Sequence, residues 1–282
     1  MSQRRRLEPA PEPPEETLEQ RSAPAERPIR RGGAPRLIEW TGERCVPWAP
    51  DVRVVYEHYH RYLWAAELAR DRRVLDLGSG EGYGSAILAA TAGHVHGLDV
   101  DERTVEHARL NYSAPNLEFS VGSALDLSRF EEGEFDLVVA FEVIEHVEEQ
   151  ERLLDEAARV LAPGGALVVS TPERRVYAEE RAEANPFHER ELTESELQEL
   201  LGRRFPRVAL WGQSPTTGSR IAALGDAAPD RGAAVALTRT GHEWAEAGEL
   251  APTYLIAVAS RGPLELPPRE STLHDHGLEL LR

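Results

Sequence analysis

The sequence has no lysine, and it contains one cysteine and one methionine among 282 residues. The single cysteine, Cys45, excludes an intrachain disulfide framework and a zinc site built from cysteines. No run of about 18 apolar residues occurs, so we expect no membrane-spanning helix and no membrane partner. The basic stretch 1–6 is followed by Pro and Glu, which is unlike a secretory signal. We therefore expect a cytoplasmic protein.

Negative charge is in clear excess, with 49 acidic residues against 32 arginines and a net charge of −17. Residues 1–36 hold eight Arg and six Glu, a net charge of +2, so residues 37–282 carry −19. An acidic body repels phosphate backbones, which disfavours a nucleic acid as partner. We expect a small-molecule acceptor instead. No feature of the sequence specifies an oligomeric state.

Composition divides the chain into three parts. Residues 1–36 are rich in Pro, Glu and Arg and contain few large apolar residues, which predicts a disordered tail. Residues 37–262 have the length and pattern of one domain, and residues 263–282 are expected to form a C-terminal tail. Within the domain, residues 52–69 predict an aromatic helix that packs on the body, covers a pocket as a lid, or does both.

From residue 72 onward the pattern alternates between short apolar strands and amphipathic helices. The predicted strands are 73–77, 94–98, 117–121, 135–140 and 166–170, and the predicted helices are 83–92, 101–110 and 148–161. A capping box at Thr193–Glu196 opens another helix, and further strands are predicted at 208–211 and 254–259. This succession predicts an α/β fold with a doubly wound, mainly parallel sheet of seven strands.

The first strand runs into a glycine-rich loop, Asp76-Leu77-Gly78-Ser79-Gly80-Glu81-Gly82. Ligands of doubly wound sheets bind at the carboxyl ends of the strands, and the second strand ends there in Asp99, 23 residues after Asp76. The dinucleotide pattern requires Gly or Ala where this loop has Tyr83 or Ser85, and no Gly-Lys-Ser/Thr of a phosphate-binding loop follows. The loop therefore predicts a nucleoside-type ligand of another kind.

Five motifs together resemble the class I S-adenosylmethionine-dependent methyltransferases: 74–82, 97–100, 122–124, 135–139 and 160–165. The resemblance implies the Rossmann-like methyltransferase fold and S-adenosylmethionine as the cofactor. By this resemblance the loop faces the methionine part of the cofactor, Asp99 binds the ribose, and Val100 packs on the adenine. The cofactor-binding residues that it implies are Asp76, Gly78, Ser79, Gly80, Asp99, Val100, Ser123, Ala124 and Phe141.

An acidic and histidine-containing motif follows the fourth strand. In a helix, Glu142, Glu145 and His146 would be spaced i, i+3 and i+4 and would share one face. His188, on the loop after the fifth strand, is a fourth candidate ligand. Two carboxylates and two imidazoles fit Mg²⁺, Mn²⁺ or a similar ion, which would lower the pKa of a substrate hydroxyl. The E-x-x-E-H pattern is similar to small-RNA 2′-O-methyltransferases and to ubiquinone-pathway O-methyltransferases.

Other interpretations of the motif stay open at this point. His146 or His188, with Glu145, would serve as general base without a metal, or the group would only shape the pocket. We expect an O-methyltransferase that acts on a hydroxyl of a small molecule such as a sugar, a glycosylated metabolite or a phenolic natural product. The alternatives are a small-molecule N-methyltransferase, an RNA 3′-end 2′-O-methyltransferase and a non-catalytic cofactor-binding protein. His94 and His96 lie on one face of the second strand and are interpreted as structural.

Overall fold

A computed structural model describes residues 45–47, 52–180, 185–216, 237–240, 243–246, 251–263 and 266–274. The predicted disordered tail, residues 1–36, lies outside the described residues, as do residues 275–282 of the predicted C-terminal tail. Among the described helices, none has the length and apolar character needed to cross a membrane.

The centre of the molecule is one seven-stranded sheet with the order β3-β2-β1-β4-β5-β9-β6. Strands β1 to β5 are parallel, and β9 runs antiparallel between β5 and β6. The bounds are Arg73–Leu77 for β1, His94–Asp99 for β2, Leu117–Val121 for β3, Phe135–Phe141 for β4, Leu161–Pro172 for β5, Arg207–Gln213 for β6 and Tyr254–Ser260 for β9. The predicted seven-stranded, mainly parallel sheet is confirmed.

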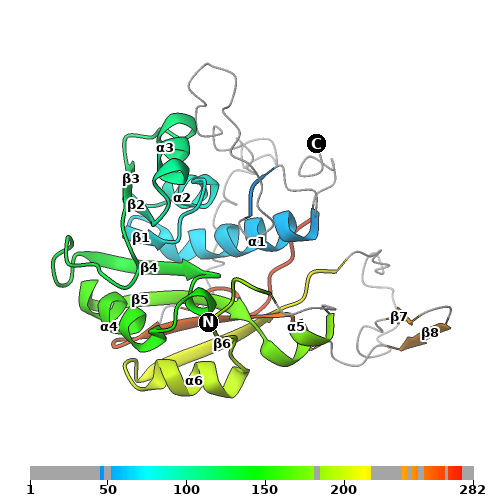
Figure 1. The fold of residues 1–282 in the computed structure, drawn as a ribbon. Coiled ribbons are helices and arrows are strands. Elements are labelled where there is room, and N and C mark those ends of the chain that lie inside the picture. Colours follow the sequence, from blue (N-terminus) through cyan, green and yellow to red (C-terminus); the bar gives the residue numbers. More distant parts are fainter. Residues whose placement is uncertain are drawn as a thin grey trace, which may run out of the picture.

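Helices cover both faces of this sheet, as Figure 1 shows for α1, α2 and α3 on one side and α4 and α6 on the other. Side chains of a strand alternate between faces, so Val74 packs toward α1 and α2 whereas Leu75 packs toward α4. The helices are α1 (Val52–Ala69), α2 (Tyr83–Ala89), α3 (Glu102–Asn111), α4 (Gln150–Val160), α5 (Arg174–Glu180) and α6 (Glu194–Gly202). Two buried cores result, one on each face.

The predicted N-terminal helix is present as α1 and packs on α2 through a close contact. Gly84 lies against the ring of Tyr62, where an added Cβ would come within 2.2 Å of the ring carbon Cζ. Tyr62 also meets Phe141 edge to face at 5.0 Å, and Tyr59 stacks on Tyr83 at the same centroid distance. The helix is thereby part of the packed body, and it also contributes to the wall of a cavity described below.

Three local features differ from the sequence-based expectation. β5 begins five residues early, at Leu161, and passes through Gly164 at φ 91° beside a register shift opposite β4. A short hairpin of β7 (Leu237–Thr240) and β8 (Glu243–Glu246) was not predicted. The helix expected to carry Glu142, Glu145 and His146 together is absent, and only a single 3₁₀ turn, η2 (Ile144–His146), follows β4.

Candidate active site

A cavity of about 630 Å³ opens at the carboxyl ends of β1, β2 and β4, where the strand order reverses. This is the position at which open α/β sheets bind ligands. Its wall includes all but one of the residues predicted for cofactor and metal: Gly78, Ser79, Gly80, Asp99, Val100, Ser123, Ala124, Phe141, Glu142, Glu145, His146 and His188. The exception is Asp76.

The loop after β1 depends on glycine for its path. Gly78 and Gly80 have φ values of 67° and 55°, in the left-handed region that disfavours other residues. A Cβ on Gly78 would also lie 2.5 Å from Cγ2 of Val143, across the cavity floor. The amide of Gly80 donates to Oδ2 of Asp99 at 2.9 Å, which fixes the loop to the end of β2.

Asp76 lies beneath this loop and not on the cavity wall. It is fully buried and accepts hydrogen bonds from the Tyr62 hydroxyl at 3.1 Å and the Ser85 hydroxyl at 2.6 Å. Burial raises the pKa of Asp76 to about 7, although the two hydroxyls favour its ionised form. The structure therefore places Asp76 beneath the loop and behind the cavity wall.

The end of β2 supplies the second predicted contact region. Asp99 accepts from the Asp101 amide at 2.9 Å through Oδ1, in addition to the Gly80 amide, so its carboxylate is oriented by backbone donors. Val100 follows with its side chain 69% exposed on the cavity wall, opposite Ser123 and Ala124 of the loop after β3. An exposed apolar side chain at this place is suited to pack on a flat ring. The ribose and adenine assignments of these residues stay predictions.

Glu142 does not join the other residues of its motif. Its φ of 53° turns the chain away at the end of β4, so the expectation of one helical face with Glu145 and His146 is wrong. Its carboxylate instead pairs with the Arg61 guanidinium and accepts from the Ser170 hydroxyl at 2.7 Å. Glu142 therefore lines the cavity as part of an ion pair with α1.

The remaining three candidate ligands do converge. Ligand atoms of Glu145, His146 and His188 all lie within 4.8 Å of one another, and the two imidazole rings meet at 4.9 Å between centroids. Glu145 is fully buried, and neither of its carboxylate oxygens accepts a well-formed hydrogen bond from the described residues, although the Thr171 hydroxyl and the Glu145 amide lie near enough to favour its ionised form. Burial and the nearby Glu142 carboxylate hold the pKa of Glu145 well above its usual value. A buried carboxylate in this condition fits a cation or a proton donor.

Hydrogen bonds fix the orientation of both rings. His146 donates from Nδ1 to the Phe187 carbonyl at 3.0 Å, and His188 donates from Nδ1 to the Glu191 carboxylate at 2.7 Å. Each neutral ring therefore carries its unprotonated nitrogen at Nε2, and that of His188 accepts a hydrogen bond from the Asn185 side-chain amide at 2.9 Å. The amides of Glu189 and Arg190 both donate to the Glu145 carbonyl, which ties the loop of His188 to the turn of His146.

A buried polar network between α1 and the sheet was not predicted from the sequence. Arg61 is fully buried, donates to Ser170 at 2.9 Å, and lies 4.6 Å above the ring of Tyr254. The Tyr254 hydroxyl donates to Glu57 at 2.8 Å, and Glu57 lies on the cavity wall. The only available signal was the i, i+4 spacing of Glu57 and Arg61 within an otherwise aromatic helix.

Comparison with known proteins agrees with this geometry. Residues 75–169 match a family model described as a methyltransferase domain. A probable S-adenosylmethionine-dependent methyltransferase of Mycobacterium tuberculosis is 37% identical over 194 residues, which are 66% of this chain and 68% of that protein. One of Mycolicibacterium smegmatis is 40% identical over 169 residues, 59% of this chain and 65% of that protein. This chain therefore spans about two thirds of the length of these relatives.

The chain belongs to the S-adenosylmethionine-dependent methyltransferase family of enzymes. A ubiquinone biosynthesis O-methyltransferase of Aromatoleum aromaticum is 35% identical over 109 residues, 38% of this chain and 47% of that protein. Among solved structures, an S-adenosylmethionine-dependent methyltransferase of Thermotoga maritima covers 74% of this chain and 94% of its own, with a TM-score of 0.51 and 21% identity. That likeness supports the fold alone.

Proposed function

We propose that this enzyme transfers the methyl group of S-adenosylmethionine to a hydroxyl of a small molecule. The observation that carries the proposal is the convergence of Glu145, His146 and His188 on the wall of the same cavity that the Gly78–Gly80 loop and Asp99 line. An amine acceptor attacks as its neutral form, whereas a hydroxyl gains from a group that removes its proton. The partial similarity to ubiquinone biosynthesis O-methyltransferases supports the same assignment.

The cofactor side of the proposal uses the β1 loop and the end of β2. The cofactor supplies an electrophilic methyl group on a sulfonium. The glycines of the loop allow the close approach of its methionine part, and the Asp99 carboxylate, oriented by two amides, is placed to accept the ribose hydroxyls. Val100, Ser123 and Ala124 then flank the adenine. The chain thereby fixes the direction in which the methyl group faces the rest of the cavity.

The acceptor side is formed by the turn after β4 and by the loop of His188. We assign proton removal from the acceptor hydroxyl to Nε2 of His146, because Nδ1 of this ring is committed to the Phe187 carbonyl. Glu145, whose ligand oxygen lies within 4.8 Å of a ring nitrogen of His146, would stabilise the resulting imidazolium. Glu57, Tyr254 and Glu142, the last held by Arg61, also line the cavity and position the acceptor.

The same three groups fit a divalent cation. The unpartnered, buried carboxylate of Glu145 and two imidazoles are a set of one oxygen and two nitrogen donors, which suits Mn²⁺ better than Mg²⁺. Glu145, His146 and His188 would hold the ion, whereas Glu142 is engaged with Arg61. A bound ion would lower the pKa of the acceptor hydroxyl, and His146 would then be a ligand in place of a base.

The test uses pairs of acceptors that share a scaffold and differ only in hydroxyl or amine. Catechols, phenols and sugars are incubated with the full-length enzyme and S-adenosylmethionine, and release of S-adenosylhomocysteine is measured. We expect turnover of hydroxyl acceptors alone. Turnover of the amine partners at equal or higher rate would overturn the proposal. Treatment with a chelator, followed by Mn²⁺ or Mg²⁺, separates the metal from the base: loss and recovery of turnover assign the metal, and unchanged turnover assigns His146 as base.

A further inference from the structure

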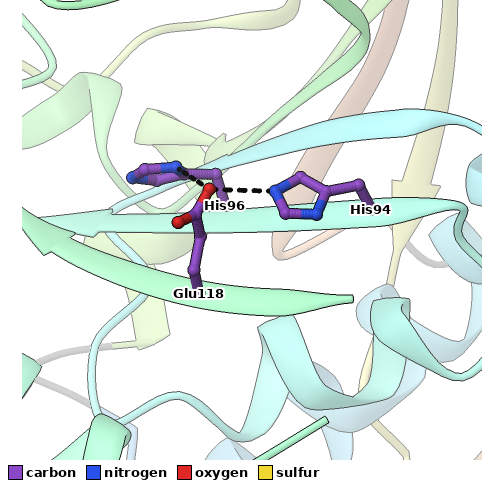
Figure 2. A group of neighbouring side chains, drawn as sticks. All are labelled: His94, His96 and Glu118. Carbon is purple, nitrogen blue, oxygen red and sulfur yellow. Dashed lines mark hydrogen bonds and ion pairs between the residues drawn. The ribbon is translucent and has the colours of Figure 1, made fainter. Parts of the chain in front are cut away.

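A second group of ligating side chains lies outside the cavity, on strands β2 and β3 at one edge of the sheet. His94 and His96 are two residues apart on β2 and therefore point to the same face. The parallel register places Glu118 of β3 directly beside His96. Figure 2 shows both imidazoles directed at the Glu118 carboxylate, where Oε1 lies 3.0 Å from Nε2 of His94 and 3.0 Å from Nδ1 of His96.

The spacing of these atoms is close to that of ligands around one metal ion. All three ligand atoms lie within 4.8 Å of one another. Zn²⁺ binds imidazole nitrogen and carboxylate oxygen at about 2.0–2.2 Å, so tetrahedral ligands lie about 3.3 Å apart. The two nitrogen–oxygen distances of 3.0 Å need to open by only a few tenths of an ångström. Three protein ligands with further positions open to water are a known arrangement for this ion.

The surroundings of the group leave room for an ion to enter. The chain from Gly122 to Glu134, between β3 and β4, contains no helix, and its Phe130 packs on the ring of His96. The side chains of His94 and Glu118 are 40% and 57% exposed, whereas that of His96 is 11% exposed. The group therefore forms an open half-site on a rigid sheet, with solvent on the side opposite His96.

The buried ring of His96 is held in place by two further contacts. Its Nε2 lies 2.6 Å from the Ser120 hydroxyl, and Phe130 meets the ring edge to face at 4.9 Å. A hydroxyl both donates and accepts, so Ser120 supports either tautomer of the ring. When Nδ1 binds an ion, the single proton of the neutral ring moves to Nε2 and is donated to Ser120. Burial lowers the pKa of His96, which keeps this ring neutral and able to bind.

We propose that His94, His96 and Glu118 bind a first-row transition metal ion, Zn²⁺ by preference, at a site independent of the cavity. Two of the three donors are imidazole nitrogens, which select zinc-like ions over Mg²⁺, an ion that favours oxygen ligands. The ion would bridge β2 to the edge strand β3. The cavity group of Glu145, His146 and His188 offers the same types of donor, so the experiment distinguishes the two sites by substitution.

The test is calorimetric titration of Zn²⁺ into tag-free, full-length enzyme and its variants. We expect His94→Asn and Glu118→Gln each to remove one equivalent of bound Zn²⁺, which is a loss of affinity of more than about 100-fold at this site. Ser120→Ala should weaken the same binding event about 10–100-fold, the usual cost of removing a group that orients a ligand. Mg²⁺ in place of Zn²⁺ should give no binding heat that these variants change.

Glu106→Gln is the matched control, because Glu106 is an exposed acid on α3 whose substitution changes the charge equally. Thermal unfolding of each metal-free variant is compared with that of the wild type to establish that the variant is folded. Equal stoichiometry and affinity for Zn²⁺ in the Glu118→Gln and Glu106→Gln variants would overturn the proposal. Loss of one equivalent in Glu118→Gln and His94→Asn, with none lost in Glu106→Gln, would establish it.

Discussion

The group of His94, His96 and Glu118 and the group of Glu145, His146 and His188 each contain two histidines and one glutamate. They differ most in the surroundings of the glutamate carboxylate. Glu118 is exposed and accepts hydrogen bonds from both of its histidines. Glu145 is fully buried, and no described residue makes a well-formed hydrogen bond to either of its oxygens; the Thr171 hydroxyl and the Glu145 amide only lie close by. Burying a carboxylate without a donor costs free energy, and a fold that retains one does so for a reason other than stability.

The comparison separates two ways in which a ligand site is built. On β2 and β3 the histidine–glutamate contacts satisfy one another, so an ion would replace an existing arrangement at little cost to the fold. At the end of β4 the histidines form hydrogen bonds with Phe187, Glu191 and Asn185, all outside the group, and the Glu145 carboxylate faces the cavity. The second arrangement is typical of reactive sites, where strain and unsatisfied groups concentrate.

The largest expected effect is on kcat, and it is tested by replacing one histidine of each group in turn. His146→Ala should lower kcat by about 10²–10⁴-fold with the hydroxyl acceptor that turns over, because proton removal contributes on this scale. His94→Ala should leave kcat within about twofold. Both rates are measured as S-adenosylhomocysteine release at saturating cofactor. A loss smaller than tenfold in His146→Ala would assign proton removal to another group.

Asp76 provides a third case, a buried carboxylate with two hydroxyl donors. Its pKa in the folded protein is about 7, above that of the unfolded chain. As pH rises from about 5.5 to about 7, the unfolded state has lost this proton and the folded state still holds it, so stability falls with pH. At about 1.4 kcal/mol per pH unit, this contribution amounts to about 2 kcal/mol. Urea unfolding should show that Asp76→Asn removes this part of the slope.

The control for this slope is Asp126→Asn. Asp126 is exposed, and hydrogen bonds from Ser128 lower its pKa, so it stays ionised over the whole interval. This variant should keep the pH dependence of the wild type. If Asp76→Asn also keeps it, the carboxyl of Asp76 is ionised in the folded protein at pH 5.5 and the two hydroxyls outweigh its burial.

The smallest expected effect is an increase in the free energy of unfolding when Glu145 is replaced, although that variant should be inactive. Glu145→Met replaces the unpartnered carboxylate with an apolar side chain of similar length, which should stabilise the chelator-treated protein by about 1 kcal/mol. Glu118→Met, at the exposed site, should change stability by less than about 0.5 kcal/mol. Both values come from urea unfolding at one pH. Destabilisation by Glu145→Met would show that its carboxylate supports the fold.

Much of the fold could be predicted from local pattern. The five parallel strands are short apolar runs bounded by polar turns, and the capping box at Thr193 and Glu196 is present at the start of α6. Alternation along β2 correctly placed His94 and His96 on one face, although their shared partner Glu118 depends on the register of β3, which no single strand encodes. The conformation of the glycine-rich loop could be predicted from its glycines, because only glycine readily adopts the φ values of 55–101° found there.

The acceptor side could not be predicted in the same way. The spacing of Glu142, Glu145 and His146 favours a helix, but one residue at φ 53° breaks it, and Arg61 from a distant helix takes Glu142 as its partner. From the sequence, Arg61 would be predicted to lie on the surface. Its burial depends on two carboxylates and the Tyr254 ring, which only tertiary packing brings together. His188 lies on the segment between α5 and α6 and lines the same cavity, an arrangement that its place in the sequence does not encode.

The acidic character of the cavity wall has a consequence for turnover. Glu57, Asp99 and Glu142 line the cavity, and Arg61 is shared between Glu57 and Glu142. S-adenosylmethionine carries a positive sulfonium, and the S-adenosylhomocysteine left after transfer does not. An electronegative enclosure therefore attracts the cofactor before reaction and loses that attraction when the methyl group departs. The negative charge of the wall thus favours binding of S-adenosylmethionine over binding of S-adenosylhomocysteine, which promotes release of the product.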